Sequence, residues 1–248
     1  MNILKYGNVI AIQSIGINLL EIEQKRHNIW IGASINNKAF SKENIRVLIN
    51  FCLQYTKEKI LVEIPGRMHA TNYKYFDGLT RAEALKKAFK DEDARKKELS
   101  EIIDGFPAEV RKNIVVANYD DICTPDHIRI RELFFREFAE QSDFYQEVID
   151  IIREIFLTRG RTPSKERLES LALYVIHELP LFVNGVQTNN DPSIYTATPY
   201  PGLGKIDQLV MNIIDGKKYP ELSKKINIKN RTGIININFK QDGKNQEN

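Results

Sequence analysis

The sequence has few of the residues that build disulfide frameworks, metal sites and membrane spans. Among 248 residues there are two cysteines and four histidines, and their spacing matches no metal-binding motif. The longest uncharged run, 6–20, contains several polar residues and is shorter than the ~20 apolar residues that cross a bilayer. We therefore expect no metal, no membrane partner and a reducing, cytoplasmic location.

Glycine motifs that bind phosphate groups are also missing. No G-x-x-x-x-G-K-S/T loop occurs, and the pair Gly202 and Gly204 lacks the third glycine of a dinucleotide fingerprint. We expect no cofactor. The composition, 42% hydrophobic and 28% charged, is that of a folded globular chain, and its net charge of +3 says little unless the positive residues gather in one place.

Short apolar runs alternate with stretches of helical periodicity along the chain. The pattern predicts strands at 28–34, 59–64 and 113–118, and helices at 44–55, 80–103, 126–158, 164–178 and 204–214. Segment 126–158 is long enough for two helices, 183–200 is rich in loop residues, 234–239 is strand-like and 241–248 is expected to be a frayed tail. The alternation predicts an α/β fold with a mainly parallel central sheet flanked by helices, in one domain over 1–248.

A serine stands at the end of the first of these strands. In a parallel sheet, ligands bind outside the carboxyl ends of the strands, so Ser34 is well placed for chemistry. Strand alternation puts Trp30, Gly32 and Ser34 on one face, where Gly32 leaves room for a substrate. Taken alone, Ser34 could equally begin an ordinary turn. The nucleophile-elbow pattern G-x-S-x-G is incomplete, because Asn36 replaces its second glycine.

A tyrosine and a glutamate lie four residues apart in the segment LYVIHELPLF, 173–182. This spacing projects Tyr174 and Glu178 from one face of the helix predicted there. If the helix ends before Pro180, Glu178 lies at the end where the helix dipole disfavours an acid. Such an acid is a candidate for binding a cation, for example a substrate ammonium group. The alternative is a common polar pair on a half-exposed surface.

The predicted helix at 80–103 carries a concentration of positive charge. Between residues 81 and 97 it has seven lysines and arginines against four acids, and Lys86, Lys90 and Lys97 share one stripe. Leu85, Ala88 and Phe89 are expected to form its apolar side. Such a stripe could neutralise RNA phosphates, although a solvated amphipathic helix has the same pattern.

Two of these segments together resemble the signature of the cyclodipeptide synthases. They are GASINNKAF, 32–40, and LYVIHELPLF, and their residues Ser34 and Tyr174 are 140 positions apart. The resemblance extends over about 28–212. It implies a Rossmann-like domain similar to the catalytic domain of class I tyrosyl- and tryptophanyl-tRNA synthetases. It also implies a ping-pong reaction in which two aminoacyl-tRNAs yield a cyclic dipeptide, without ATP.

The resemblance also assigns roles to single residues. It implies that Ser34 carries the first aminoacyl group as an ester, that Asn37 helps to hold the substrate, and that Tyr174 and Glu178 bind its ammonium group. Tyr200 of Tyr200-Pro201 matches the loop tyrosine of one subfamily, whereas Asn37 is typical of the other, and Tyr195 competes with Tyr200 for the role. The remaining expected contacts are Trp30, Gly32 and Leu181 to the first aminoacyl group, and Lys86, Lys87, Lys90, Arg95, Lys96 and Lys97 to tRNA.

Two other functions remain open from the sequence. A serine esterase would need a histidine close to Ser34 in space. His177 is next to Glu178 in sequence, but adjacent helical residues face different directions. A non-catalytic tRNA-binding relative of the synthetases would bind RNA through the basic helix and would not need Ser34.

Overall fold

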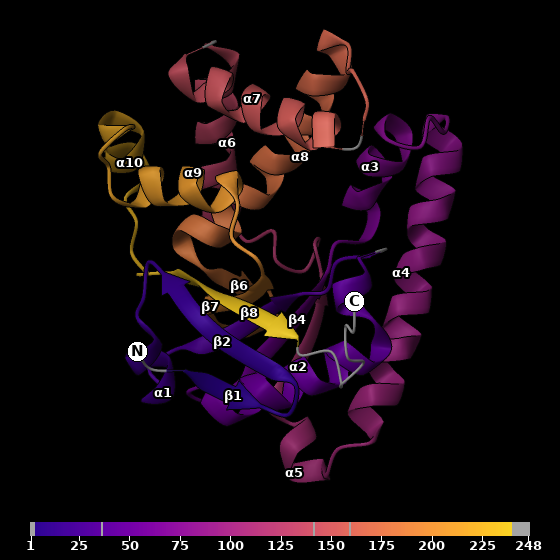
Figure 1. Cartoon of the computed structure of the whole chain (residues 1–248), viewed down its shortest axis with the longest axis vertical. Helices are drawn as coiled ribbons and strands as arrows, with labels where there is room; N and C mark the ends of the chain where they lie inside the picture. Colours follow the sequence, from indigo (N-terminus) through magenta and orange to yellow (C-terminus); the bar gives the residue numbers. More distant parts are fainter. Residues whose placement is uncertain (1–2, 36, 141, 159, 240–248) are drawn as a thin grey trace, which may run out of the picture.

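The computed structural model describes residues 3–35, 37–140, 142–158 and 160–239. Its centre is an eight-stranded sheet in the order β1-β2-β8-β7-β3-β4-β5, and β6 pairs with β7 (Figure 1). The strands are β1 (Leu4–Tyr6), β2 (Val9–Ile15), β3 (Asn28–Gly32), β4 (Ile60–Ile64), β5 (Ile114–Asn118), β6 (Val186–Thr188), β7 (Asp191–Pro201) and β8 (Gly233–Phe239).

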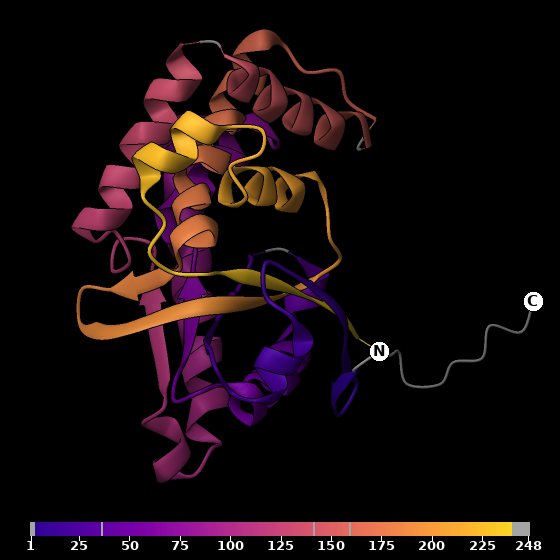
Figure 2. The ribbon, with the colours of Figure 1, turned by 90° about the vertical axis from the view of Figure 1, so that its left-hand side faces the viewer.

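Ten α-helices and two short 3-10 helices surround the sheet in the described part of the chain. They are α1 (Leu19–Glu23), η1 (Lys38–Phe40), α2 (Lys42–Tyr55), η2 (Gly66–His69), α3 (Ala70–Tyr75), α4 (Arg81–Asp104), α5 (Ala108–Arg111), α6 (Pro125–Ala139), α7 (Asp143–Thr158), α8 (Lys165–Asn184), α9 (Lys205–Ile214) and α10 (Pro220–Ile226). Helices α6 to α10 lie above the sheet in both ribbon views, and α4 runs beside α3 (Figures 1 and 2).

The central strands of the sheet are parallel. Strand β3 pairs in parallel with β4 and β7, β4 with β5, and β7 with β8, whereas β1 with β2, β2 with β8, and β6 with β7 are antiparallel. The predicted α/β class with a mainly parallel sheet is therefore confirmed. The three predicted strands are β3, β4 and β5, and segment 126–158 forms two helices, α6 and α7. The expected frayed tail, 241–248, lies outside the described residues.

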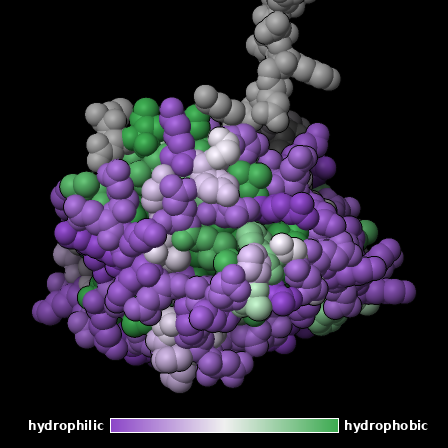
Figure 3. All heavy atoms as spheres, turned by 90° about the horizontal axis from the view of Figure 1, so that it is seen from below, coloured by the Kyte–Doolittle hydropathy of each residue, from purple (hydrophilic) through white to green (hydrophobic). Residues whose placement is uncertain are grey.

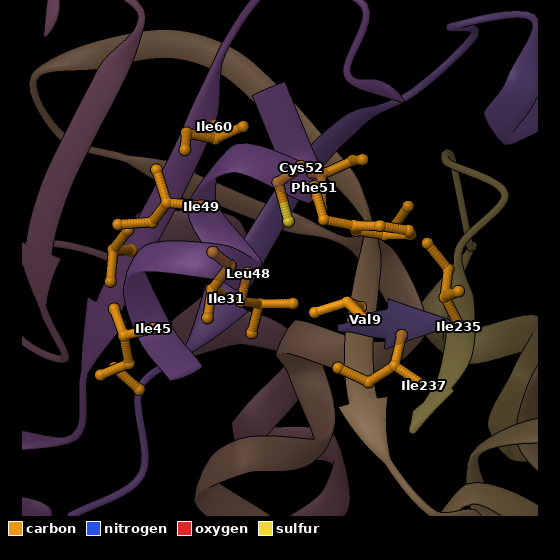
Figure 4. Close-up of a cluster of buried hydrophobic side chains, with 14 of the residues drawn as sticks. Val9, Ile31, Ile45, Leu48, Ile49, Phe51, Cys52, Ile60, Ile235 and Ile237 are labelled. Carbon is orange, nitrogen blue, oxygen red and sulfur yellow. The ribbon is translucent and has the colours of Figure 1, made fainter. Parts of the chain in front are cut away.

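Both faces of β3 and β4 are covered, which explains why these two strands are largely apolar. On one face, Ile31 and Ile60 pack against side chains of α2 such as Leu48 and Ile49 (Figure 4). On the other face, Trp30 and neighbouring side chains pack under α8. Alternation along β3 and β4 thus sends one set of side chains into a closed core and the other set toward α8.

Helix α8 is longer than the sequence pattern predicts. The prediction that it ends before Pro180 is wrong, because the helix continues to Asn184 with Pro180 inside it. A proline inside a helix removes one backbone hydrogen bond. Here the last turns contain Leu179, Leu181 and Val183, each no more than 3% exposed. Burial of these side chains compensates for the free-energy cost of the hydrogen bond that is lost at Pro180.

The segment predicted to be loop-rich, 183–200, instead contains the end of α8 and a β-hairpin. Strands β6 and β7 turn at Asn189 and Asn190, and β7 lies at the centre of the sheet between β3 and β8. Because β7 contains several polar and turn-forming residues, it does not show the apolar pattern by which β3, β4 and β5 are predicted. Strands β1 and β2 and helix α10 are further elements that the sequence pattern does not predict.

In the residues that the structure describes, no helix has both the length and the apolarity needed to cross a bilayer. The face below α2 and α5 is mostly hydrophilic, with a small hydrophobic area near its centre (Figure 3).

Candidate active site

The carboxyl ends of β3, β4 and β7 open into a cavity of about 600 Å³ beneath the helices. Its volume is typical of a small-molecule site. Helices α3, α7, α8 and α9 provide the remaining walls. Many of the residues singled out by the sequence are among those that line it, and the lining includes Trp30, Gly32, Ser34, Glu63, Tyr174, Glu178, Leu181, Thr198 and Tyr200.

Ser34 follows β3 directly, and backbone hydrogen bonds fix its position. The Ala33 N–H donates to the Glu63 carbonyl at 2.8 Å, and the Ser34 N–H donates to the Gly32 carbonyl at 2.9 Å. In addition, the Arg95 guanidinium donates to the Ser34 carbonyl at 3.4 Å and to the Phe40 carbonyl at 2.9 Å. The half-buried serine is therefore fixed at the cavity wall by hydrogen bonds from the sheet and from α4.

Tyr174 and Glu178 face the cavity together from α8. The Tyr174 phenol hydrogen-bonds the Glu178 carboxylate, which counteracts part of the effect of burial on the glutamate. Burial is the stronger influence and raises the pKa of Glu178 to about 7. The argument from the helix dipole is wrong, because α8 continues to Asn184 and Glu178 is not in its last turn. The raised pKa of Glu178 is therefore caused by desolvation and not by the dipole at a helix end.

Of the two candidate loop tyrosines, only Tyr200 is among the residues that line the cavity. Tyr200 follows Thr198 on the same face of β7, hydrogen-bonds the Asn37 side chain and lies 5.9 Å from Phe40 between ring centroids. Asn37 also caps η1 by accepting a hydrogen bond from the Ala39 N–H at 3.0 Å. Tyr195 instead is fully buried, and its hydroxyl donates to Asp191 at 3.2 Å.

The residues expected to contact the first aminoacyl group lie side by side on the cavity wall. Trp30 is 4% exposed, and its ring lies 5.3 Å from that of Phe182 between centroids. Leu181 is buried beside it in the same cluster. A Cβ atom built on Gly32 would lie 3.3 Å from the Trp30 ring. The absence of a side chain at position 32 therefore keeps this part of the cavity open.

The histidines lie outside the cavity lining and contact other residues. None of the described residues that line the cavity is a histidine. His27 pairs with Thr196 at 2.8 Å, and His127 and His177 both contact the Tyr119 hydroxyl, at 3.2 and 3.1 Å. Within the described residues, no group of three or more histidine, cysteine or acidic side chains is arranged to hold a metal ion.

The model of the cyclodipeptide synthase family matches residues 11–195 of this sequence. The chain belongs to the cyclodipeptide synthase family. The resemblance of the two sequence segments to this family is thereby confirmed. No curated protein sequence matches the chain.

Solved cyclodipeptide synthases have the same fold. The structure from Bacillus thermoamylovorans is 16% identical, with a TM-score of 0.71 over 90% of this chain and 93% of that one. A Mycobacterium tuberculosis structure, described as relating cyclodipeptide synthetases to type I tRNA synthetases, is 14% identical, with a TM-score of 0.70 over 95% of both chains. A third, from Candidatus Glomeribacter gigasporarum and bound to Phe-tRNAPhe, is 13% identical, with a TM-score of 0.54 over 88% and 89%.

The basic residues of α4 in this cyclodipeptide synthase are used in different ways. Lys86, Lys90 and Lys97 are exposed on the helix. Two other lysines are paired within the helix, Lys87 with Asp91 at 2.9 Å and Lys96 with Glu92 at 2.5 Å. The Arg95 side chain is only 11% exposed and pairs with Glu98 besides its two carbonyl contacts. Arg95 thus contacts the Ser34 segment, a contact that no pattern in the sequence predicts.

Phe89 and the apolar face of α4 also differ from expectation. The sequence pattern assigned Phe89 to the buried side, but its side chain is 51% exposed. The buried side contains Ala88, as expected, together with Ala84, Glu92, Leu99 and Ile102. An exposed aromatic ring therefore stands between Lys86 and Lys90 on the solvent side of the helix.

Sequence reasoning missed Glu63. It comes from β4, pairs in register with Gly32 and lines the cavity although it is only 5% exposed. Burial, and then the neighbouring Glu178, raise the pKa of Glu63 to about 8. The available signal was one acid inside the otherwise apolar run ILVEI, since a lone charge in a buried strand is costly unless it is paired.

This buried carboxyl should make the stability of the free enzyme depend on pH. An acid whose pKa is raised by folding from 4.5 to about 8 destabilises the fold progressively as pH rises between these values. We expect Glu63→Gln to raise the Tm at pH 8 by at least about 2–4 °C, equivalent to about 1 kcal/mol in a chain of this size. At pH 4.5 the gain should be much smaller. Thermal unfolding followed by circular dichroism at both pH values measures the difference.

Glu147→Gln is the matched control for this prediction. Glu147 is a partly buried carboxylate outside the cavity, paired with Lys218 and Tyr219. Its replacement breaks these contacts and should lower the Tm at pH 8. A similar loss in Glu63→Gln would contradict the interpretation of Glu63 as an uncompensated acid.

Proposed function

We propose that this protein uses two aminoacyl-tRNAs to make a cyclic dipeptide through an aminoacyl ester on Ser34. The observation that carries the proposal is the single cavity lined by Ser34, Tyr174, Glu178 and Tyr200. A hydroxyl at a strand end, opposite a carboxylate that can hold an ammonium group, is suited to accepting an aminoacyl group.

In the first step, the Ser34 hydroxyl attacks the ester carbonyl of the first aminoacyl-tRNA. A bond forms between the serine oxygen and the carbonyl carbon, the bond to the terminal ribose oxygen breaks, and the serine proton ends on that oxygen. The aminoacyl ester of tRNA is already activated, so exchanging one ester for another requires no ATP. Glu178 and Tyr174 hold the α-ammonium group during this step.

In the second step, the amine of the Ser34-bound residue attacks the ester carbonyl of the second aminoacyl-tRNA. The peptide bond forms, the bond to the terminal ribose oxygen breaks, and the second tRNA leaves with its ribose hydroxyl restored. That amine must first lose its proton, and Glu178, whose pKa is about 7, is suited to accept it near neutral pH. The amine of the second residue then attacks the Ser34 ester. Ring closure releases the cyclic dipeptide and restores the serine hydroxyl, with Tyr200 as a candidate relay for the proton.

The cavity favours this reaction over a serine esterase. A serine hydrolase of the common type activates its nucleophile through a histidine, and the four histidines of this chain have other partners or lie outside the cavity lining. A non-catalytic tRNA-binding protein would have no need to bury two carboxyl groups beside a serine.

Incubation of the purified protein with a mixture of charged tRNAs tests the proposal. Mass spectrometry of the small products should detect cyclic dipeptides, and intact-protein mass spectrometry after rapid acid quenching should detect an aminoacyl adduct on the peptide that contains Ser34. Formation of free amino acids alone would favour an esterase. Binding of tRNA without any product or adduct would favour the non-catalytic relative.

We also propose that the exposed side of α4 binds the tRNA backbone. Lys86, Lys90 and Lys97 project from it, and Phe89 offers a ring on which a base can stack. The helix packs against α3, and Asn72 of α3 and the adjoining Phe76 line the cavity. A relative in this family has been solved with Phe-tRNAPhe bound, which supports tRNA as the partner.

Arg95 and Lys90 should affect different steps. Arg95→Ala removes the hydrogen bonds to the Ser34 and Phe40 carbonyls, so we expect the maximal rate of Ser34 acylation to fall about 10-fold or more, with tRNA affinity changed much less. Lys90→Ala should weaken tRNA binding, reduce the slope of log K against log salt by about 1 and leave the maximal rate nearly unchanged.

Single-turnover acylation at saturating charged tRNA separates these effects, together with filter binding at several salt concentrations. Arg95→Lys keeps the charge but cannot reproduce the fork of donors, so it should restore little of the acylation rate. If Arg95→Ala and Lys90→Ala behaved alike in both assays, Arg95 would be a tRNA contact rather than a positioning residue.

A further inference from the structure

Glu63 is a second carboxyl group in the cavity, and one of its oxygens is unpartnered. Its Oε1 atom is buried with no hydrogen-bond partner among the described residues. The residue is fixed on β4 in register with Gly32, so the side chain faces the same side of the sheet as Gly32 and Trp30. A buried polar atom without a partner is rare in a folded protein and calls for an explanation.

The other charged groups of the cavity do not supply that partner. The described lining contains four acids, Glu63, Glu154, Glu178 and Asp207, and one basic residue, Lys205. Lys205 is paired with Glu154, and Asp207 accepts the Gly204 N–H at 2.5 Å. Glu63, which is buried, and Glu178, which is partly buried, are left as two carboxyl groups without a protein cation.

One substrate ammonium group compensates only one of these carboxyl groups. In the reaction proposed above, the α-ammonium of the first aminoacyl group is assigned to Glu178. Glu63 would then stay beside the occupied site, buried and unpaired. A buried carboxyl group without a partner is energetically unfavourable. A second positive charge on the substrate would pair with it and so strengthen binding. The cavity therefore has the charge pattern for a substrate with two cationic groups.

The space beside Glu63 has a shape and chemistry suited to such a group. A Cβ atom on Gly32 would lie 3.7 Å from Glu63 Oε2 and 3.3 Å from Cζ3 of Trp30. The unfilled position at Gly32 is therefore flanked by a carboxylate and by an indole ring. Tryptophan is the best aromatic partner for a cation, and a carboxylate beside it adds direct charge pairing.

We propose that the first aminoacyl group carries a cationic side chain, of the ammonium or guanidinium type found in lysine and arginine, and that Glu63 and Trp30 bind it. This inference rests on the proposed function, because it takes Ser34 as the acceptor of that group. It adds the class of amino acid that the enzyme selects first.

Product analysis with the complete set of charged tRNAs tests the selectivity of the unmodified protein. We expect the dominant cyclic dipeptides to contain lysine or arginine. Reactions supplied with one charged tRNA at a time should acylate Ser34 at least about 10-fold faster with Lys-tRNA or Arg-tRNA than with Gln-tRNA or Leu-tRNA. Cyclic dipeptides made only of uncharged residues would overturn this inference and leave the proposed function intact. A lack of product and adduct with every charged tRNA would overturn both.

Two substitutions at position 63 assign the selectivity to Glu63. Glu63→Gln keeps the size and removes the carboxyl group that ionises to pair with the bound cation, so acylation by the cationic aminoacyl group should fall at least about 10-fold. Glu63→Leu should shift acylation toward apolar residues. Glu147→Gln, the control outside the cavity, should keep the original order of preference. A cationic preference that persists unchanged in both position-63 variants would overturn the assignment, and circular dichroism confirms that each variant is folded.

Discussion

Replacing Ser34 with alanine is expected to abolish cyclic dipeptide formation, with a loss of at least about 10³-fold in rate. The alanine variant lacks the oxygen that forms the ester, so neither the aminoacyl nor the dipeptidyl enzyme can exist. The fold should be unaffected, because the contacts that fix this segment are made by the backbone of residues 32 to 34. Liquid chromatography with mass spectrometry measures the product after incubation with charged tRNAs.

Binding and acylation must be measured on the same variant to interpret this loss. The Ser34→Ala protein should retain its affinity for charged tRNA and show no mass adduct after quenching. Ser193→Ala, on the hairpin and outside the cavity lining, is the matched control and should form both adduct and product. Product formation by Ser34→Ala at a rate near that of the unmodified protein would rule out the covalent route.

The strands and the two sequence segments around Ser34 and Tyr174 could be predicted because their signals are local. Strands β3 and β4 are buried on both faces and therefore appear as short continuous apolar runs, and the edge strand β5 is a similar apolar run although only part of it is buried. The spacing of Tyr174 and Glu178 fixes their common direction on any helix. Ser34 and Glu178 come together because parallel strands present their carboxyl ends at one edge of the sheet, beneath α8.

The features that could not be predicted depend on distant partners. Strand β7 contains prolines and polar residues, and it is a strand because β3 and β8 pair with it on both sides. Helix α8 passes Pro180 because its last turns are buried. Arg95 has the sequence context of a surface lysine stripe, yet its guanidinium reaches the Ser34 segment, 61 positions away. Contacts between residues far apart in the chain produce no periodic pattern in the sequence, so they could not be predicted from it.

Glu178→Gln is expected to reduce the rate of product formation by about 10²-fold or more. Glutamine has the same shape, but it has no negative charge to hold the α-ammonium group and cannot accept its proton. The variant should therefore have a raised KM for the first aminoacyl-tRNA and a slower formation of the peptide bond. Tyr174→Phe removes the hydroxyl that helps to hold the ammonium group and that hydrogen-bonds Glu178, but it keeps the carboxylate, so it should show a smaller loss of about 10-fold.

The pH profile distinguishes this role from a purely structural one. Because the pKa of Glu178 is raised to about 7, the carboxylate becomes ionised as pH rises from about 6 to 8, and the rate should increase over this range. The increase should disappear in Glu178→Gln and persist in Glu147→Gln, whose carboxylate lies outside the cavity lining. Rapid-quench measurements of ester formation and product release at each pH separate the two steps. If Glu178→Gln retained the rise with pH, another group would hold and deprotonate the substrate amine.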